Sequence, residues 1–460
     1  MKWIGWLAVM IALLCLSGFL GANSRTNHPA VRSLPDGSIL KLGGTSYGLG
    51  HTFSLNAANS WRARVGKYLP KAWLLRLGWL PFQGAMVIGS PPGCPVPNLA
   101  IFTVCLPANP GSFGEMRAVL VDDHGSLFDA GGTDASLVSS YSKDAKDALR
   151  LDTWNLTAFP RRGKNLLFRC FQFSKARTKW EPVAEFDVPN PTPGPYPQWR
   201  PEPLPSTKQD GDLSVTLQSL SCRVLDIGSI VPTVGEEISR TYADFRLVQA
   251  GRTNQTWRPV NVEISDATGN HWTPWDYIAS PKPRNGLAEL IFRGALWRGE
   301  TAWKLRYEFS RTTGFEPDEI FTFSGVEVPG PDQVITLDNA TVVDGTKVQL
   351  IAVSGEAAEQ PDRLKHFAMT NSANISISVR LMPRDKRLSL VRIVDQNGRE
   401  AKVAVGADVK YPERVFGFRP AEGARQLSFT FALHKSRYVD FLARPQFVDR
   451  SRPLDISGFR

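Results

Sequence analysis

The sequence predicts a mostly β protein with three tandem immunoglobulin-like β-sandwich domains after an N-terminal transmembrane or signal segment. Two observations support this fold class. The chain has 38 glycines and 34 prolines among 460 residues, above the average usage of about 7% and 5%, and such an excess of turn formers favours many short strands. A pattern of strands and turns also recurs three times. Hydrophobic residues make up 42% and charged residues 21%, which excludes a polytopic membrane protein and a mostly disordered chain.

Residues 1–24 form the predicted membrane segment. After Met1-Lys2 an almost unbroken apolar run continues to Ala22, and about 20 such residues can cross a bilayer as a helix. This run is longer than the core of a cleavable signal peptide, which favours an uncleaved anchor, although Ala22-Asn23-Ser24 also fits a cleavage site. We expect the rest of the chain to lie outside the cytoplasm, in the periplasm or at the cell surface, and to be secreted if the segment is cleaved.

Two proline-rich breaks divide the remaining chain into three units. The first break, 189–211, has eight prolines between Pro189 and Pro205, which predicts a stiff, extended linker that spaces two modules without fusing them. A recognition motif for a proline-binding domain is the other interpretation of this segment. The second break lies around Pro329. The predicted domains are therefore 29–188, 212–329 and 332–446, followed by a tail at 447–460.

Each unit contains the same predicted hairpin. A β-branched strand runs into an Asp-x-x-Gly turn at Asp122, at Asp266 and at Asp395. The Asp side chain is expected to accept hydrogen bonds from its own turn, while the Gly supplies a positive φ angle. One carboxylate per turn is too few for Ca²⁺, which takes six to eight oxygen ligands, so the spacing predicts structure and no metal site.

The first unit carries an insertion at about 50–95. The chain has a formal net charge of +10, and no Asp or Glu occurs between His51 and Gly114. Indole rings and cations are typical of a membrane–water interface, and the interface candidates are Trp61, Arg62, Arg64, Lys67, Lys71, Trp73, Arg76 and Trp79. A short amphipathic helix at 71–77 that packs onto the sandwich explains the same pattern and is the more common structure. Such a surface also fits single-stranded nucleic acid, but we expect no nucleic-acid partner outside the cytoplasm.

The five cysteines match no zinc motif, so neither a metal nor another cofactor is expected. Cys94 and Cys105 flank a proline-rich turn and are the predicted disulfide. Cys170 and Cys222 fit buried free thiols on strands equally well.

No catalytic residue is predicted. The six histidines lie outside the common catalytic motifs, and the sequence has no G-x-S-x-G, H-E-x-x-H or P-loop pattern. His124 lies in the first turn, where the other two turns carry Thr268 and Asn397, which excludes a shared catalytic role. Trp272 and Trp275 follow the second turn and are the ligand-binding candidates, because an aromatic platform at a loop edge suits sugar stacking.

A hairpin motif near the N-terminus carries the one resemblance to other proteins. Residues 34–42 are LPDGSILKL, and Thr45-Ser46-Tyr47-Gly48 and His51 follow. Over residues 29–82 the chain resembles a group of uncharacterised bacterial proteins that pair an N-terminal anchor with this LPDGS hairpin. The resemblance brings no known activity. It implies a bacterial, membrane-anchored, extracytoplasmic protein.

These observations predict a non-enzymatic extracytoplasmic envelope protein that acts as a binding or scaffolding module. The expected partners are the membrane, through the N-terminal segment, and envelope proteins or glycans at the loops. The alternative is a secreted carbohydrate-binding or carbohydrate-active protein that uses loop aromatics.

Overall fold

The computed structural model describes most of the chain after the N-terminal segment. The described ranges are 31–54, 68, 70, 85–89, 97–106, 108, 116–121, 127–129, 137–141, 150–174, 179–226, 237–274, 277–279, 285–293, 296–311, 313–355, 375–382, 386–406 and 413–448. Within these ranges every regular element is a β-strand, which confirms the mostly β prediction. The predicted membrane segment precedes them, and none of these residues belongs to a helix that is long and apolar enough to span a bilayer.

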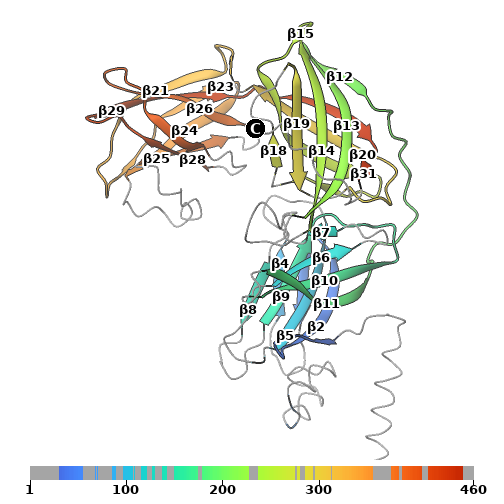
Figure 1. Ribbon diagram of the computed structural model, residues 1–460. Coiled ribbons are helices and arrows are strands. Elements are labelled where there is room, and N and C mark those ends of the chain that lie inside the picture. Colours follow the sequence, from blue (N-terminus) through green and yellow to red (C-terminus); the bar gives the residue numbers. More distant parts are fainter. Residues whose placement is uncertain are drawn as a thin grey trace, which may run out of the picture.

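Three units appear as three lobes in Figure 1, with the first in blue and cyan, the second in green and yellow, and the third in orange. Each unit has one larger and one smaller sheet, and the pairing within each sheet is antiparallel except between β13 and β31. A further hairpin in the first unit pairs β3 (Gly50–Ser54) with β4 (Ala85–Gly89).

The first unit spans residues 31–189. Its larger sheet has the order β1-β2-β5-β9-β8, with the bounds Val31–Ser33, Ile39–Gly48, Asn98–Leu106, Arg150–Leu156 and Leu137–Tyr141. Its smaller sheet has the order β11-β10-β6-β7, with the bounds Lys179–Pro189, Asn165–Ser174, Met116–Val121 and Leu127–Asp129. Trp154 of the first sheet meets Phe168 of the second edge to face, with ring centroids 6.1 Å apart.

The second unit comprises residues 206–311 together with 437–448. Its larger sheet has the order β12-β13-β14-β19-β18, with β15 beside β14 and β31 beside β13; the bounds are Ser206–Asp210, Leu213–Asp226, Glu237–Gln249, Leu287–Arg293, Tyr277–Ala279, Arg252–Thr253 and Gln446–Val448. Its smaller sheet has the order β17-β16-β20-β30, with the bounds His271–Trp272, Trp257–Asp266, Trp303–Arg311 and Arg437–Ala443.

The third unit spans residues 320–433. Its larger sheet has the order β22-β24-β25-β28-β27, with β23 beside β24; the bounds are Val334–Thr336, Thr346–Gly355, Ile375–Met382, Glu413–Arg419, Lys402–Gly406 and Ala340–Val343. Its smaller sheet has the order β21-β29-β26, with the bounds Ile320–Glu327, Gln426–Leu433 and Leu388–Asp395.

The strands follow from two-residue alternation, and β20 shows it clearly. Trp303 and Leu305 are fully buried, whereas Lys304 between them is exposed. Successive side chains of a strand point to opposite faces of its sheet, so one face enters the core and the other meets solvent. Burying each large apolar side chain contributes about 1.5 to 3 kcal/mol, which fixes the register because a slip of one residue would expose the whole set.

The predicted turns are confirmed at Asp266 and Asp395. Asp266 Oδ1 accepts the backbone N–H groups of residues 268 and 270 at 2.9 and 3.0 Å, and Asp395 Oδ1 accepts those of residues 397 and 399 at 2.8 and 2.9 Å. Gly269 and Gly398 adopt φ angles of 89° and 76°, a conformation that costs other residues roughly 1 to 2 kcal/mol. The turn that begins at Asp122 lies outside the described residues.

The edge strand that closes the smaller sheet has a different origin in each unit. In the first unit β11 follows β10 directly, and the two pair as a hairpin. In the second unit β20 takes the position of β10, but its partner is β30 from near the end of the chain. In the third unit β29 takes that position, and its partner is β21, which follows β20 in sequence. The second and third units have therefore exchanged their closing strands.

This exchange differs from the predicted boundaries 212–329 and 332–446. The sequence assigns residues 320–327 to the second domain and 437–443 to the third, and the structure pairs each segment with the other sandwich. Both segments have strand-like alternation. Residues 320–327 follow β20 and residues 437–443 follow β29, and each segment could form a simple hairpin with the strand before it. The local pattern therefore does not distinguish the hairpins from the observed pairings. The predicted tail at 447–460 also begins inside the fold, since β31 pairs in parallel with residues 221–223 of β13.

Candidate functional site

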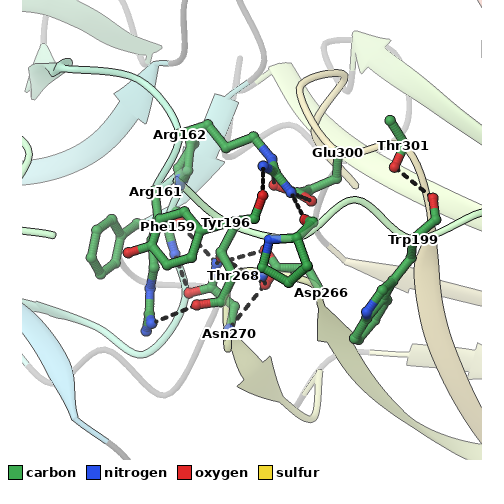
Figure 2. Close-up of polar contacts among 12 residues, drawn as sticks. Phe159, Arg161, Arg162, Tyr196, Trp199, Asp266, Thr268, Asn270, Glu300 and Thr301 are labelled. Carbon is green, nitrogen blue, oxygen red and sulfur yellow. Dashed lines mark hydrogen bonds and ion pairs between the residues drawn. The ribbon is translucent and has the colours of Figure 1, made fainter. Parts of the chain in front are cut away.

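The candidate site is the pair of junctions that fix the three units to one another. The linker joint lies between the first and second units; Figure 2 shows its polar contacts, formed by the loop 159–163, the linker residues 190–205, the turn 266–270 and Glu300-Thr301. The crossover joint lies between the second and third units, at the segments 308–319, 386–389 and 434–436. Both joints use polar side chains that are largely buried.

The linker joint begins with the Asp-x-x-Gly turn of the second unit, which docks against the first unit. Asn270, which is 1% exposed, donates from Nδ2 to the carbonyl of Phe159 at 2.8 Å and accepts the Phe159 N–H at 3.3 Å. Arg161 donates to the carbonyl of Thr268 at 3.1 Å. Asp266 fixes the positions of Thr268 and Asn270, because its carboxylate accepts hydrogen bonds from the Thr268 hydroxyl at 2.7 Å and from the Asn270 amide at 2.7 Å.

Arg162 is the centre of the linker joint. Its guanidinium forms a two-point ion pair with Glu300, with Nε–Oε1 and Nη2–Oε2 distances of 2.7 and 3.0 Å, and it also donates to the carbonyls of Tyr196 and Pro197 at 3.2 and 2.6 Å. One planar guanidinium can bind a carboxylate and two carbonyls at once because its five N–H donors are held in a fixed fork. Arg162 therefore ties the first unit, the linker and the second unit together (Figure 2).

Glu300 is largely removed from water, with 1% of its surface exposed. Burial raises the pKa of its carboxyl group, and the nearby Asp266 adds to the increase, while the hydrogen bond from Arg162 opposes it. A buried carboxylate of this kind is tolerated only with a well-placed cation and hydrogen bonds. Glu300 thus depends on Arg162 for its place in the fold.

The linker lies along both neighbouring units, in contrast to the predicted spacer that would leave them separate. At its start Asn190 donates to the carbonyls of Arg161 and Gly163 at 2.8 and 2.6 Å. Further on, the Thr301 hydroxyl donates to the carbonyl of Trp199 at 2.7 Å. The apolar core is also continuous across the joint, since one cluster of buried side chains includes residues of both units. The first and second units are consequently packed as one body.

The crossover joint has His434 at its centre. Its ring is 7% exposed and hydrogen-bonds through Nδ1 to Ser310 of β20 and through Nε2 to Ser389 of β26 at 2.7 Å, so one imidazole bridges two sandwiches. Burial lowers the pKa of His434 to about 3, and the nearby guanidinium groups of Arg387 and Arg414 contribute to the decrease. The ring is therefore neutral near pH 7.

Two carboxylates complete the crossover joint. Glu308 of β20 accepts from the Ser436 hydroxyl at 2.7 Å and pairs with Arg387 of the third unit at 3.2 Å. Glu319, which precedes β21, accepts the Lys435 N–H at 2.9 Å and lies 3.3 Å from the Arg311 guanidinium. These contacts hold the two chain segments side by side where they cross between the units.

The predicted aromatic platform at Trp272 and Trp275 is wrong for its first member. Trp272 is 5% exposed, and its ring stacks on Trp297 and meets Trp303 edge to face, each with centroids 5.6 Å apart. Its faces are covered by other indole rings, so they are not open to a sugar. Trp275 lies outside the described residues.

The cysteine predictions have different outcomes. Cys105 is a buried free thiol in the structure, whereas the sequence predicts a disulfide with Cys94, which lies outside the described residues. Cys170 and Cys222 are buried free thiols, which is one of the two states that the sequence allows. Burial raises the pKa of Cys105 to about 12 and that of Cys222 to about 11.

The membrane-interface candidates from Trp61 to Trp79 all lie outside the described residues. Among the residues that the structure does describe, no group of three or more His, Cys, Asp or Glu side chains is arranged to hold a metal ion. No family model matches the chain, and no curated protein matches its sequence.

The residues of both joints were not predicted from the sequence. Arg161 and Arg162 belong to a loop that matches no motif, and His434 lies between two strands of ordinary composition. One signal was available for the linker joint. The repeated turn has Asn270 where the third unit has Arg399, and in the third unit Arg399 closes its own turn on Asp395 at 2.8 Å. Asn270 also bonds to its own Asp266, at 2.7 Å, and its short, neutral amide bonds in addition to the Phe159 carbonyl of the first unit.

Proposed function

We propose that the protein is a non-enzymatic extracytoplasmic scaffold that presents the loops of three immunoglobulin-like sandwiches at fixed relative positions for binding. The observation that carries this proposal is the linker joint, in which Arg162 bonds to Glu300 of the second unit and to two linker carbonyls. A scaffold needs defined distances between its modules. Buried, multiply bonded polar contacts between modules supply them, because each such contact has specific geometry.

The crossover joint supports the same function. Domain contacts within one chain usually resemble transient interfaces and allow relative motion. Here the third unit is inserted between β20 and β30 of the second, so the chain crosses between the two units twice. The hydrogen bonds of His434 to Ser310 and Ser389 fix one unit to the other at these crossings. The three sandwiches are thus suited to act as one rigid piece.

The location outside the cytoplasm is part of the proposal and rests on the apolar segment at 3–22. We expect a C-terminally tagged chain to fractionate with the membrane and to be degraded by added protease only from outside the cell or after the envelope is opened. Recovery of the tagged chain as a soluble cytoplasmic protein would contradict the location and would leave the rigid-scaffold part standing.

The rigidity itself can be measured as a distance distribution. Spin labels at Ser33 in the first unit and Arg252 in the second, both exposed, with Cys15 and Cys94 replaced by serine, should give one narrow distance peak by double electron–electron resonance. Arg162→Ala should broaden this peak, because it leaves Glu300 buried without its cation and releases the linker.

Lys164→Ala is the matched control, since Lys164 is an exposed cation two residues further along the same loop. Its distance peak should equal that of the parent chain. A broad distribution in the parent chain, or equal broadening in the two variants, would contradict the rigid-scaffold proposal.

A further inference from the structure

The linker presents a regular ridge of side chains to solvent. Between residues 190 and 205 every residue except Gln198 and Trp199 is either a proline or immediately precedes one. Proline fixes φ near −65°, and a residue before proline is driven to extended backbone. Such a segment adopts the polyproline II helix, which has three residues per turn. Figure 1 shows it as the long green trace between β11 and β12.

Between residues 194 and 203 the exposure of two edges of the linker follows the three-residue repeat of this helix. One edge, consisting of Tyr196, Trp199 and Glu202, is half-buried against the two units. A second edge is exposed at every position; its residues are Pro191, Gly194, Pro197, Arg200 and Pro203. We call this second edge the linker ridge. Its period matches the helix, so the prolines and the arginine stand in one row.

The protein holds the ridge in its extended form. The carbonyls of Tyr196, Pro197 and Trp199 accept hydrogen bonds from Arg162 and Thr301, and the Glu202 N–H donates to the carbonyl of Leu442 in β30 at 2.6 Å. A free proline-rich peptide loses conformational entropy when a partner orders it, and an already ordered segment avoids much of this cost.

Arg200 gives the ridge a single positive charge. Its guanidinium forms no ion pair with the residues that the structure describes, while the nearby Glu202 is engaged by Lys208 at 2.7 Å. Arg200 lies in the ridge three residues after Pro197 and three before Pro203, and it is exposed. A polyproline II helix that carries one arginine beside its prolines complements an aromatic-lined groove with carboxylates at one end.

We propose that the linker ridge is a docking surface for a protein domain that binds polyproline II helices, with Pro197 and Pro203 in an aromatic groove and Arg200 in an acidic pocket. This adds a partner class to the proposed scaffold. It requires an ordered linker but is independent of the location of the chain. Recognition of this kind uses one face of the ligand helix, so a helix whose other face lies on its own protein remains able to bind.

The test uses the full chain and purified SH3 domains with an acidic specificity pocket as the probe, with binding followed by isothermal titration. We expect at least one of these domains to bind the parent chain. Arg200→Glu should weaken that binding about tenfold or more, because it places like charges together at the acidic pocket. Pro197→Ala should also weaken it, since the ring that fills the groove is lost.

Gln198→Ala is the matched control. Gln198 is exposed and adjacent to Pro197 but belongs to a different edge of the helix, so its removal should leave the affinity unchanged within twofold. Equal losses for Gln198→Ala and Arg200→Glu, or no binding by any of the probe domains, would overturn the proposal. The Ser33–Arg252 distance should remain narrow in Arg200→Glu, which separates failure of the ridge from failure of the scaffold.

Discussion

His434 is a buried histidine that the fold keeps neutral, and this has a consequence for stability in acid. Its pKa is about 3 in the folded chain against an ordinary value of 6.5, so between these values the unfolded chain binds a proton that the folded chain does not. The stability contributed by the neutral ring is fully present above about pH 6.5 and decreases as the pH falls towards 3. The crossover joint should therefore weaken in mild acid while the rest of each sandwich is less affected.

We expect the free energy of opening at the crossover joint to fall by roughly 2 to 3 kcal/mol between pH 7 and pH 4.5. Hydrogen exchange followed by mass spectrometry over residues 426–443 measures this opening. His434→Gln keeps a donor and an acceptor but does not titrate, so it should flatten the pH dependence. His271→Gln, at an exposed histidine of the second unit, should leave the dependence as in the parent chain. A flat profile in the parent chain would contradict the assignment.

At the scale of single elements, the repeated Asp-x-x-Gly turn shows one local structure in two roles. In the third unit Arg399 donates a hydrogen bond to the carboxylate of Asp395 in the same turn, and residues 396–400 are exposed. In the second unit the turn is buried except at Gly269 and carries Asn270, which bonds to the first unit. The same backbone geometry thus forms a surface loop in one sandwich and an interdomain contact in another.

Substitution of the two turn aspartates should separate these roles. Asp266→Ala removes four hydrogen bonds to two buried residues and should destabilise the protein by about 2 to 4 kcal/mol. Asp395→Ala removes two backbone hydrogen bonds and the ion pair with Arg399. Residues 396–400 of this turn are exposed, so water can replace the lost partners and the substitution should cost about 1 kcal/mol. Urea unfolding of the two variants gives the comparison. Equal losses would show that docking of the second turn contributes nothing to stability.

Prediction from sequence succeeded where the cause is local. Asp266 and Gly269 determine a turn within a few residues, and the alternation in β20 determines which of its faces is buried. The partner of a closing strand is a different kind of property, because β21 and β30 can each form a ladder with either β20 or β29 by pattern alone. Arg162 and Glu300 are 138 residues apart in sequence, and no local rule relates two positions at that distance.

At the scale of the whole molecule, the strand exchange should keep the chain associated after a cut at the boundary that the sequence predicts between its second and third domains. If a protease site is inserted between Gly330 and Pro331 in the full chain, cleavage yields one fragment that ends with β21 of the third unit. The other fragment holds the remaining strands of the third unit together with β30 and β31 of the second. We expect the two fragments to remain associated in size-exclusion chromatography without denaturant. Each fragment holds a strand of the other's sandwich.

The control is a cleavage site within 227–236, between β13 and β14, which leaves the exchange intact and should also give one species. Separation of the fragments after cleavage at Gly330 would show that each sandwich closes with its own strand, as β10 and β11 do in the first unit. It would restore the boundaries that the sequence alone suggests.

The exchanged strands also determine how the molecule responds to a pulling force. The third unit leaves the second after β20 and returns to it at β30, and the chain ends its described course in β31 beside β13. Tension applied between residue 31 and residue 448 is transmitted through the first and second units alone. The third unit bears no force, because both of its connections to the second unit, at β20 and β30, lie in the same sheet. The third unit comes under tension only after β31 and then β30 have detached from the second unit. The pairing of these two strands therefore protects the third sandwich from unfolding, and its chain can extend only once they are lost.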